Sequence, residues 1–350
     1  MRDGTRVTMR DVAAAAGVSV PTVSRVLNGA ATVDPELSAR VRKAADRLGY
    51  RPNAIARALR SSVSHTFGLV IPDIANPFFP RLVKAVEQRL RGSGYVLLLA
   101  DAQNDVAVER EVIADLLQRS VDALLVSPCD RERSASAMLA AAAEIPVVQI
   151  DRRATAELPW VGADQWGAIH DVLRHLVAAG VRRPAFIGPL TTESPALERL
   201  RAFAEVPVGE LEGWDRPTFT CPSDVAAARA LTAEILATRP DIDALVCGND
   251  VIAFGALEIC RRAGRSDIAV TGFDETFLAE ASGLTSVEQP LSALAETAIR
   301  LCLGAGGEAG DGAGGAEGEG RRERAGQARE QVRHACRVVA RGSTTSGATV

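Results

Sequence analysis

The sequence predicts a small all-α headpiece followed by an α/β core of two doubly wound, parallel-sheet lobes. Two short helices joined by a tight turn, over residues 8–29, have the layout of a helix-turn-helix. From residue 66 onward, short apolar runs alternate with amphipathic segments, as in parallel sheets covered by helices on both faces. Charge divides the chain in the same way, because residues 1–61 carry a net +6 and the remainder carries −10. A basic headpiece on an acidic body suits binding to a phosphate backbone.

Local signals mark the ends of the first two helices. Thr8 and Asp11 form a Thr-x-x-Asp start similar to a capping box, and Gly17 stands where a left-handed C-cap is expected. Ser19 can cap the second helix, and Pro21 falls in its first turn, where a missing N–H costs little. The residues expected to close a small shared core are Val12, Ala16, Val18, Val23 and Val26 or Leu27. An ordinary helical hairpin is the alternative.

A third helix should begin at the N-cap Asp34 and Pro35 and end before Gly49. Residues 52–61 predict one more short helix between headpiece and core. Helices of that length are marginal on their own in water, so this one could order when bound and melt when free.

The N-terminal residues 5–61 resemble the headpiece of the LacI/GalR family of bacterial transcription regulators. The match rests on Asp11-Val-Ala, Ala16-Gly-Val-Ser, Thr22-Val-Ser-Arg-Val-Leu-Asn, Gly49-Tyr-Arg-Pro-Asn and Ala56-Arg-Ala-Leu. The resemblance implies a headpiece at 1–50, a hinge helix at 51–62 and an effector-binding and dimerisation core at 63–350. It also implies that the second helix reads the major groove of a pseudo-palindromic DNA operator, while the hinge helix enters the minor groove.

Carried over by position, the resemblance implies that Val20, Pro21 and Arg25 face the bases and that Leu59 is an apolar wedge. The hydroxyl and amide side chains of the second helix are expected to hold phosphates or caps. Arg25 could instead make a plain phosphate contact. Leu59 could instead be a core residue of a dimer interface. The whole set expected at the DNA is Thr8, Ser19, Val20, Pro21, Thr22, Ser24, Arg25, Asn28, Asn53, Ala56 and Leu59.

The body of the chain contains two successive series of apolar runs. The candidate strands are 68–71, 95–99, 123–126 and 147–150, then 184–187, 244–247 and 268–270. Two series suggest two similar lobes, with ligands expected in the cleft at the carboxyl ends of the strands. The sequence has no run of 18 apolar residues, so no membrane partner is expected.

Residues 63–303 and 335–344 resemble the periplasmic-binding-protein-like core of the same family. The landmarks include Pro72-Asp-Ile-Ala-Asn-Pro-Phe-Phe79, Val148-Gln-Ile-Asp151, Gly248-Asn-Asp250 and Gly272-Phe-Asp274-Glu. The expected division places lobe 1 at about 63–160 and 291–303, and lobe 2 at about 161–290 and 335–344. The Gly/Ala/Glu-rich segment 304–330 has too few hydrophobes to pack and is expected to be a disordered loop.

Several polar residues at strand ends are candidates for binding a small effector, most simply a sugar. By analogy with the family, Asp151, Arg199, Asn249 and Asp274 would bond hydroxyl groups, and Phe78 or Phe79 would form an apolar wall. Asp73 and Asn76 complete the effector set.

Each candidate has a structural alternative. Asp73 and Asn76 could only cap the helix after Pro77, and Asn249 and Asp274 could only satisfy turn backbones. Arg199 could pair with Glu193 or Glu198 on a solvated face.

These observations predict a ligand-controlled transcription regulator, most often a repressor. A homodimer is expected, because the short polar end 344–350 has no counterpart of the family's tetramer-forming leucine-heptad tail. A purine or another metabolite as effector, co-repression and activation stay open.

Other classes of protein fit less well. A solute-binding protein would need a signal peptide and no basic headpiece, and the polar start of the chain favours the cytoplasm. Six cysteines without a CxxC suggest reduced thiols, with no cofactor and no metal. Asp151, Asp250 and Asp274 could form a carboxylate pair, but no phosphate loop or nucleophile elbow supports an enzyme.

Overall fold

The computed structural model describes residues 7–27, 33–50, 63–189, 193–304 and 330–344. The chain forms two compact units, Met1–Ser64 and His65–Val350, each described here by itself. The predicted DNA contacts Asn28, Asn53, Ala56 and Leu59 lie outside the described residues, and so does most of the loop predicted at 304–330.

The first unit contains three helices, α1 (Met9–Ala16), α2 (Val20–Leu27) and α3 (Pro35–Leu48). The carboxylate of Asp11 accepts hydrogen bonds from the Thr8 N–H and the Thr8 hydroxyl, both at 2.7 Å. Gly17 and Gly49 end α1 and α3 in left-handed conformations, with φ of 64° and 66°. Asp34 Oδ1 accepts from the first N–H groups of α3. The predicted helix ends are therefore confirmed.

The headpiece core is made of small side chains. Val12, Val23 and Val41 are completely buried at its centre, with alanines from α1 and α3 around them. Arg40 donates from Nη2 to the carbonyl of Ala16 at 2.7 Å, which links α3 to the end of α1. So small a core leaves little surplus stability, and single substitutions within it should matter.

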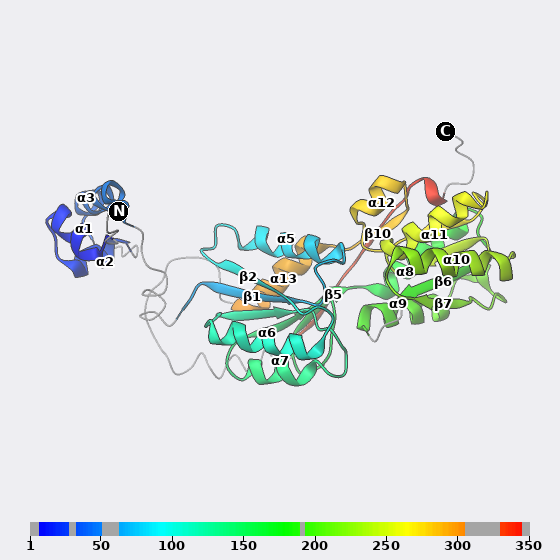
Figure 1. Cartoon of the computed structure of the whole chain (residues 1–350), viewed down its shortest axis with the longest axis horizontal. Coiled ribbons are helices and arrows are strands. Elements are labelled where there is room, and N and C mark those ends of the chain that lie inside the picture. The colour runs from blue at the N-terminus through cyan, green and yellow to red at the C-terminus, as the bar shows by residue number, and fades with distance from the viewer. Residues whose placement is uncertain (1–6, 28–32, 51–62, 190–192, 305–329, 345–350) are drawn as a thin grey trace. The chain divides into compact units, whose positions relative to one another are not determined.

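The first lobe of the core is a parallel sheet with the strand order β11-β5-β4-β3-β1-β2. Its strands are β1 (Thr66–Ile71), β2 (Val96–Asp101), β3 (Ala123–Val126), β4 (Val147–Ile150), β5 (Trp160–Ala163) and β11 (Gln331–His334). One face is covered by α5 (Phe78–Leu90) and α13 (Leu291–Leu303), and the other by α6 (Val106–Gln118) and α7 (Ala135–Ala142) (Figure 1).

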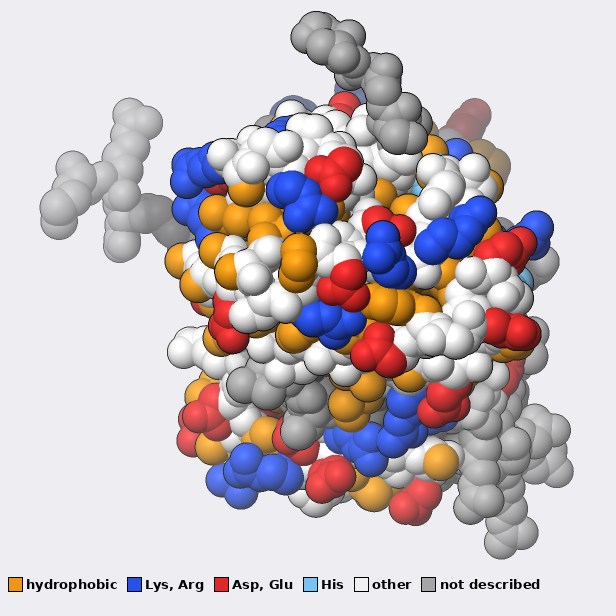
Figure 2. All heavy atoms as spheres, turned by 90° about the vertical axis from the view of Figure 1, so that its right-hand side faces the viewer, with side chains coloured by type: hydrophobic (Ala, Val, Ile, Leu, Met, Phe, Trp, Pro, Cys, Tyr) orange, Lys and Arg blue, Asp and Glu red, His pale blue; other side chains and the backbone are white. Residues whose placement is uncertain are grey.

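The second lobe repeats this plan with a four-stranded parallel sheet in the order β7-β6-β8-β9. Its strands are β6 (Pro184–Pro189), β7 (Thr218–Cys221), β8 (Ala244–Cys247) and β9 (Ala269–Thr271). Its helices are α8 (Gln165–Ala178), α9 (Ser194–Glu205), α10 (Val225–Thr238), α11 (Asp250–Arg262) and α12 (Phe277–Ser282). The helices α8 and α9 pack on one face, and α10 and α11 on the other. Acidic, basic and apolar side chains are interspersed at the end of this lobe (Figure 2).

The described chain crosses between the lobes three times. The first crossing comes after β5. The second lies between the short strand β10 (Ser286–Glu288) and α13, and the third lies between β11 and β12 (Arg337–Val339). An antiparallel ladder joins β10 and β12. The expected lobe boundary near residue 160 falls at the start of β5, which pairs with β4, so the first sheet continues to residue 163. Its edge strand β11 lies beyond the segment predicted as a loop.

All seven predicted strands are present, and within the described residues the sequence patterns miss five others. The missed strands β5, β7, β10, β11 and β12 have only three or four residues each. The predicted strands β3, β4 and β8 are equally short but fully buried. The missed strands β7, β11 and β12 contain exposed residues, so no continuous apolar run marks them. Among the helices that the structure describes, none combines the length and the apolarity needed to cross a bilayer.

Candidate functional site

The helix α2 turns one face to the headpiece core and leaves the other in solvent. Val23 and Val26 are buried, whereas Ser19, Pro21 and Arg25 are exposed, and Val20 is 37% exposed. Because these residues share the outward face, the predicted base-reading positions can all be reached by a partner.

The other predicted DNA contacts that the structure describes are Thr8, Ser19, Thr22 and Ser24. Thr22 and Ser24 are half-buried, and the exposed Thr8 donates its hydroxyl to Asp11. The hydroxyl oxygens of Ser19 and Thr22 lie 2.8 Å apart, and Ser19 Oγ accepts from the Thr22 N–H at 3.3 Å. Ser19 therefore caps α2, as the sequence predicts.

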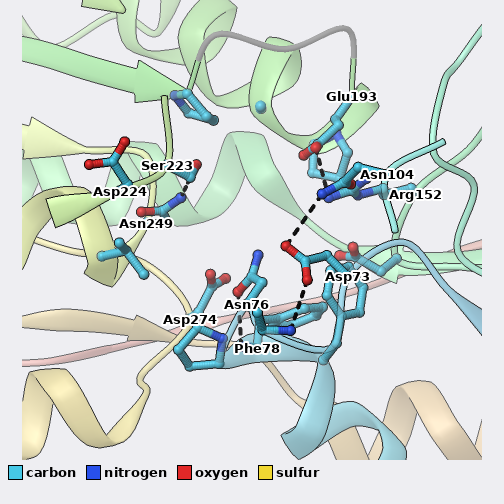
Figure 3. A pocket seen from close by; sticks show the side chains of 18 of the residues that line it. Asp73, Asn76, Phe78, Asn104, Arg152, Glu193, Ser223, Asp224, Asn249 and Asp274 are labelled. Carbon is cyan, nitrogen blue, oxygen red and sulfur yellow. Dashed lines mark hydrogen bonds and ion pairs between the residues drawn. The ribbon is translucent and has the colours of Figure 1, made fainter. Parts of the chain in front are cut away.

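The second unit contains a cavity of about 430 Å³ at the carboxyl ends of strands from both lobes. All eight residues predicted for the effector line it, namely Asp73, Asn76, Phe78, Phe79, Asp151, Arg199, Asn249 and Asp274. Figure 3 labels Asp73, Asn76, Phe78, Asn249 and Asp274 among them. They follow β1, β4, β8 and β9 or lie on α5 and α9. A cavity of this size in this place is typical of a small-molecule site.

An aromatic pair forms the apolar part of the wall. Phe78 and Phe79 open α5 and are 3% and 1% exposed, with ring centroids 5.1 Å apart in an edge-to-face arrangement. The guanidinium of Arg152 lies 5.3 Å from the centroid of Phe79. Such a wall can contact the C–H face of a ring.

Asp73 and Asn76 have structural roles besides lining the cavity. Asn76 Oδ1 accepts from the Phe78 N–H, the first of α5, at 3.1 Å, although the N-cap position itself is Pro77. Asp73 accepts from the Ala75 N–H at 2.8 Å and from Asn104 Nδ2 at 3.3 Å. Both side chains are thereby held in place at the start of α5.

Arg199 is a buried organiser of the cleft. Its Nε donates to Gln165 Oε1 at 2.7 Å, its Nη1 donates to the Gly248 carbonyl at 2.6 Å, and its Nη2 lies 3.8 Å from Asp274. The guanidinium also stacks on Phe273, 3.6 Å from the ring centroid. The alternative of a solvated pairing with Glu193 or Glu198 is therefore wrong.

Two aspartates of the cleft adopt left-handed backbone conformations. The φ angles are 65° at Asp151 and 101° at Asp274, which is uncommon for residues with a Cβ and typical of functional sites. Burial raises the pKa of each carboxyl to about 6, and neighbouring arginines oppose that shift. Asp274 Oδ1 also accepts from Gln289 Nε2 at 2.8 Å. Asp274 therefore does more than satisfy a turn.

Asn249 and Asp250 have different partners at the start of α11. Asn249 Oδ1 accepts from the Ile252 N–H at 2.9 Å, so it caps the helix, and its amide donates to Ser223. Asp250 accepts from the N–H and hydroxyl of Thr276 and from the Ser286 hydroxyl. Asp250 thus joins α11 to the turn before α12 and to β10. Burial raises the pKa of this carboxyl to about 7, with the nearby Asp274 as the second cause.

Sequence reasoning missed six polar residues that line the cavity: Asn104, Arg152, Glu193, Ser223, Asp224 and Gln289. Arg152 directly follows Asp151, so its position just after the fourth predicted strand could have identified it. Ser223 and Asp224 follow β7, which the patterns also miss. Arg152 and Glu193 form an ion pair of 2.7 Å between the lobes (Figure 3).

Comparisons with known proteins agree with this architecture. Residues 8–53 match the family model described as bacterial regulatory proteins of the lacI family. Residues 64–298 match the model for periplasmic binding proteins and the sugar binding domain of the LacI family.

The relatives extend along most of the chain. The ribose operon repressor of Halalkalibacterium halodurans is 33% identical over 85% of this chain and 89% of its own length. The transcriptional repressor PurR of Photobacterium profundum is 30% identical over 85% of this chain and 91% of its own.

A solved structure of the lac repressor dimer, bound to operator and the anti-inducer ONPF, has a similar fold. Its TM-score is 0.83 at 22% identity, covering 98% of this chain and 100% of that one. Since the family models cover both units and the relatives span nearly the whole chain, the protein belongs to the LacI family of bacterial regulatory proteins.

Proposed function

We propose that this protein is a cytoplasmic repressor that binds a pseudo-palindromic operator as a homodimer and responds to a sugar in its cleft. The observation that carries the proposal is the pairing of two sites in one chain. One is an exposed recognition face on α2, and the other is a polar, aromatic-walled cleft about the size of a small ligand.

Each half of this proposal has chemical support. Arg25 is exposed on α2 and can bond guanine bidentately, while Val20 and Pro21 offer apolar contacts. The cleft presents carboxylates, amides and guanidinium groups beside two phenyl rings, which suits hydroxyl groups and the C–H face of a sugar. A relative that is named a ribose operon repressor, and a regulator solved with cellobiose at 25% identity, support this ligand class.

The two units must communicate for the ligand to control the operator. A hundredfold change in operator affinity corresponds to about 3 kcal/mol of coupling, an ordinary value for two linked sites. We propose that the hinge containing Leu59 provides this link, with Leu59 as a wedge in the minor groove. Leu59→Ala should then weaken binding to the operator much more than binding to random DNA.

The proposal is tested by selecting an operator from a random DNA pool and measuring its affinity with and without candidate ligands. Arg25→Ala should lower the affinity for the selected operator by about 10- to 100-fold, since a bidentate base contact is worth about 1–3 kcal/mol. Arg47→Ala, an exposed arginine of α3, is the matched control and should affect operator and random DNA equally. A protein that prefers no duplex over random competitor would contradict the proposal.

A further inference from the structure

Carboxylates outnumber cations in the wall of the cleft. The acidic lining residues are Asp73, Asp151, Glu193, Asp224 and Asp274, against the two cations Arg152 and Arg199. Charges that line a partly enclosed cavity are screened less than charges on an open surface. An anionic ligand would therefore meet a wall of its own sign.

Both cations are already paired. Arg152 holds Glu193 at 2.7 Å, with side-chain exposures of 6% and 24%. Arg199 is fixed by Gln165, by the Gly248 carbonyl and by the nearby carboxylate of Asp274. A phosphate that displaced Glu193 or Asp274 from its guanidinium would leave a carboxylate in the wall without its cation, which is costly in a partly buried site.

Helix N-termini at the cleft do not offer a ready anion site either. The helices α5, α10 and α11 all begin there, and a free helix N-terminus favours anions. Each of the three already has a side-chain oxygen bonded in its first turn, from Asn76, Asp224 and Asn249 respectively. The fourth helix, α9, begins beside the carboxylate of Glu193.

Three polar atoms of buried lining residues have no hydrogen-bond partner. They are Asp151 Oδ1, Gln289 Oε1 and Arg152 Nη1, in residues that are at most 5% exposed. Two acceptors and one donor match hydroxyl groups, which can both donate and accept. A hydroxylated ligand would thus satisfy atoms that the protein leaves unpaired.

We propose that the cleft takes a polyhydroxylated effector without phosphate or carboxylate, and that Glu193 sets this specificity by occupying Arg152. The inference rests on the proposed function, because it concerns the effector of the same cleft. Glu193 acts here as a repulsive element against the wrong ligand as well as a partner of Arg152.

Matched ligand pairs test the proposal on the full-length protein. Thermal shift followed by calorimetry would compare pentoses, hexoses and disaccharides with their phosphorylated or carboxylated counterparts, such as D-ribose with D-ribose 5-phosphate, D-galactose with D-galactose 1-phosphate and cellobiose with cellobionate. We expect at least one neutral sugar to bind. Its anionic counterpart should bind at least about 30-fold more weakly, because the wall repels it.

The Glu193→Gln variant tests the residue itself. Removing this carboxylate frees Arg152, so the preference for the neutral sugar should fall by about tenfold. Glu198→Gln is the matched control, because Glu198 also pairs across the lobes, with Arg333 at 2.7 Å, but does not line the cavity. It should leave the preference within about twofold, since its charge lies outside the cleft. The ratio of the affinities for the neutral sugar and its anionic counterpart, taken within each variant, also cancels any effect of that variant on lobe closure.

The outcomes separate cleanly. The inference is overturned if an anionic ligand binds as tightly as its neutral counterpart. It is also overturned if none of the neutral or anionic sugars binds. An equal change of preference in Glu193→Gln and Glu198→Gln removes the role of Glu193. Operator binding by the same preparations judges the proposed function independently: release of the operator by a sugar phosphate contradicts the inference alone, and absence of operator preference contradicts the proposed function.

Discussion

The proposed DNA-contact face of the headpiece and the proposed effector cleft of the core would recognise their partners in opposite ways. In the headpiece, the candidates from Ser19 to Arg25 lie on the short helix α2 or directly before it, and most of them are exposed. In the core, the cleft collects side chains from Asp73 to Gln289, and many of them are buried and bonded to one another.

The difference reflects the two partners. A duplex is large and presents its own rigid surface, so a convex helix with free side chains is enough to contact it. A small ligand has to be surrounded, and surrounding it requires residues that many loops hold in place. The headpiece should therefore depend on its small core, whereas the cleft should depend on its network of bonds.

The largest expected effect comes from charging the headpiece core. Val23→Asp places an unpaired carboxylate where the native side chain is fully buried, at a cost of more than about 3 kcal/mol. Operator affinity should fall by more than about 100-fold, because α2 loses its support. In calorimetry the transition of the core should not move. Val20→Ser, at an exposed position of the same helix, should leave the headpiece folded, and retention of operator binding by Val23→Asp would contradict this account.

Removing the organiser of the cleft should have the next largest effect, on the other partner. Arg199→Met leaves Asp274 and Gln165 without their guanidinium partner, so effector affinity should drop by about 30- to 100-fold. Operator affinity without effector should stay within about threefold, because Arg199 lies in the other unit. The control is Arg229→Met, which breaks an ion pair with Glu258 away from the cleft. Parallel losses of effector and operator binding would refute this separation.

The stability of the core and the stability of the headpiece should change in opposite directions with pH. The carboxyls of Asp151, Asp274 and Asp250 have pKa values raised to about 6, 6 and 7 by burial, so the folded core binds more protons than the unfolded chain above pH 4. The stability of the core should therefore fall as the pH rises from about 4 to 7, with a core Tm roughly 2–5 °C lower at pH 8 than at pH 5.

The headpiece should respond in the opposite direction. Hydrogen bonds from Thr8 lower the pKa of Asp11, so the contribution of this contact is lost only as the pH falls below about 4. Scanning calorimetry at pH 3, 5 and 8 resolves the two transitions. Asp250→Asn should flatten the dependence of the core on pH, and a core transition that rises between pH 5 and pH 8 would show the sign to be wrong.

The smallest expected effect concerns the turn of the helix-turn-helix. At Gly17, φ is 64°, and an added Cβ would come within 3.4 Å of Arg40 Nη2. Gly17→Ala should lower headpiece stability by about 1 kcal/mol and leave the core unchanged. Gly209→Ala, in the core at an ordinary φ with open space around it, is the matched control. Equal shifts for both variants in thermal denaturation would show that backbone conformation at Gly17 is not the cause.

The three described helices of the headpiece could be predicted from the sequence, because the signals that mark their ends are local. Thr8, Gly17 and Asp34 act on neighbours a few residues away, and the structure places each at the helix end that the sequence indicates. In the core, the strands made of continuous apolar runs were evident for the same reason. The strands β7 and β11 mix polar and apolar residues and were not evident, since their place depends on pairing with β6 and β5.

The same distinction applies to the cleft. Asp151 directly follows β4 and Asp274 lies three residues after the end of β9, and both strands were predicted, so both aspartates were found. The ion pair of Arg152 with Glu193 joins residues 41 positions apart on two lobes. No local pattern contains that pairing, because it exists only once both sheets have formed.

The three crossings of the chain between the lobes limit how the core can move. Segments after β5, after β10 and after β11 all connect the same two bodies, and the β10–β12 ladder ties two of them together. Bodies connected at several adjacent points retain rotation about a common axis but lose free sliding and separation. Occupancy of the cleft would then be converted into an angle, a single mechanical variable that the DNA-binding unit can sense.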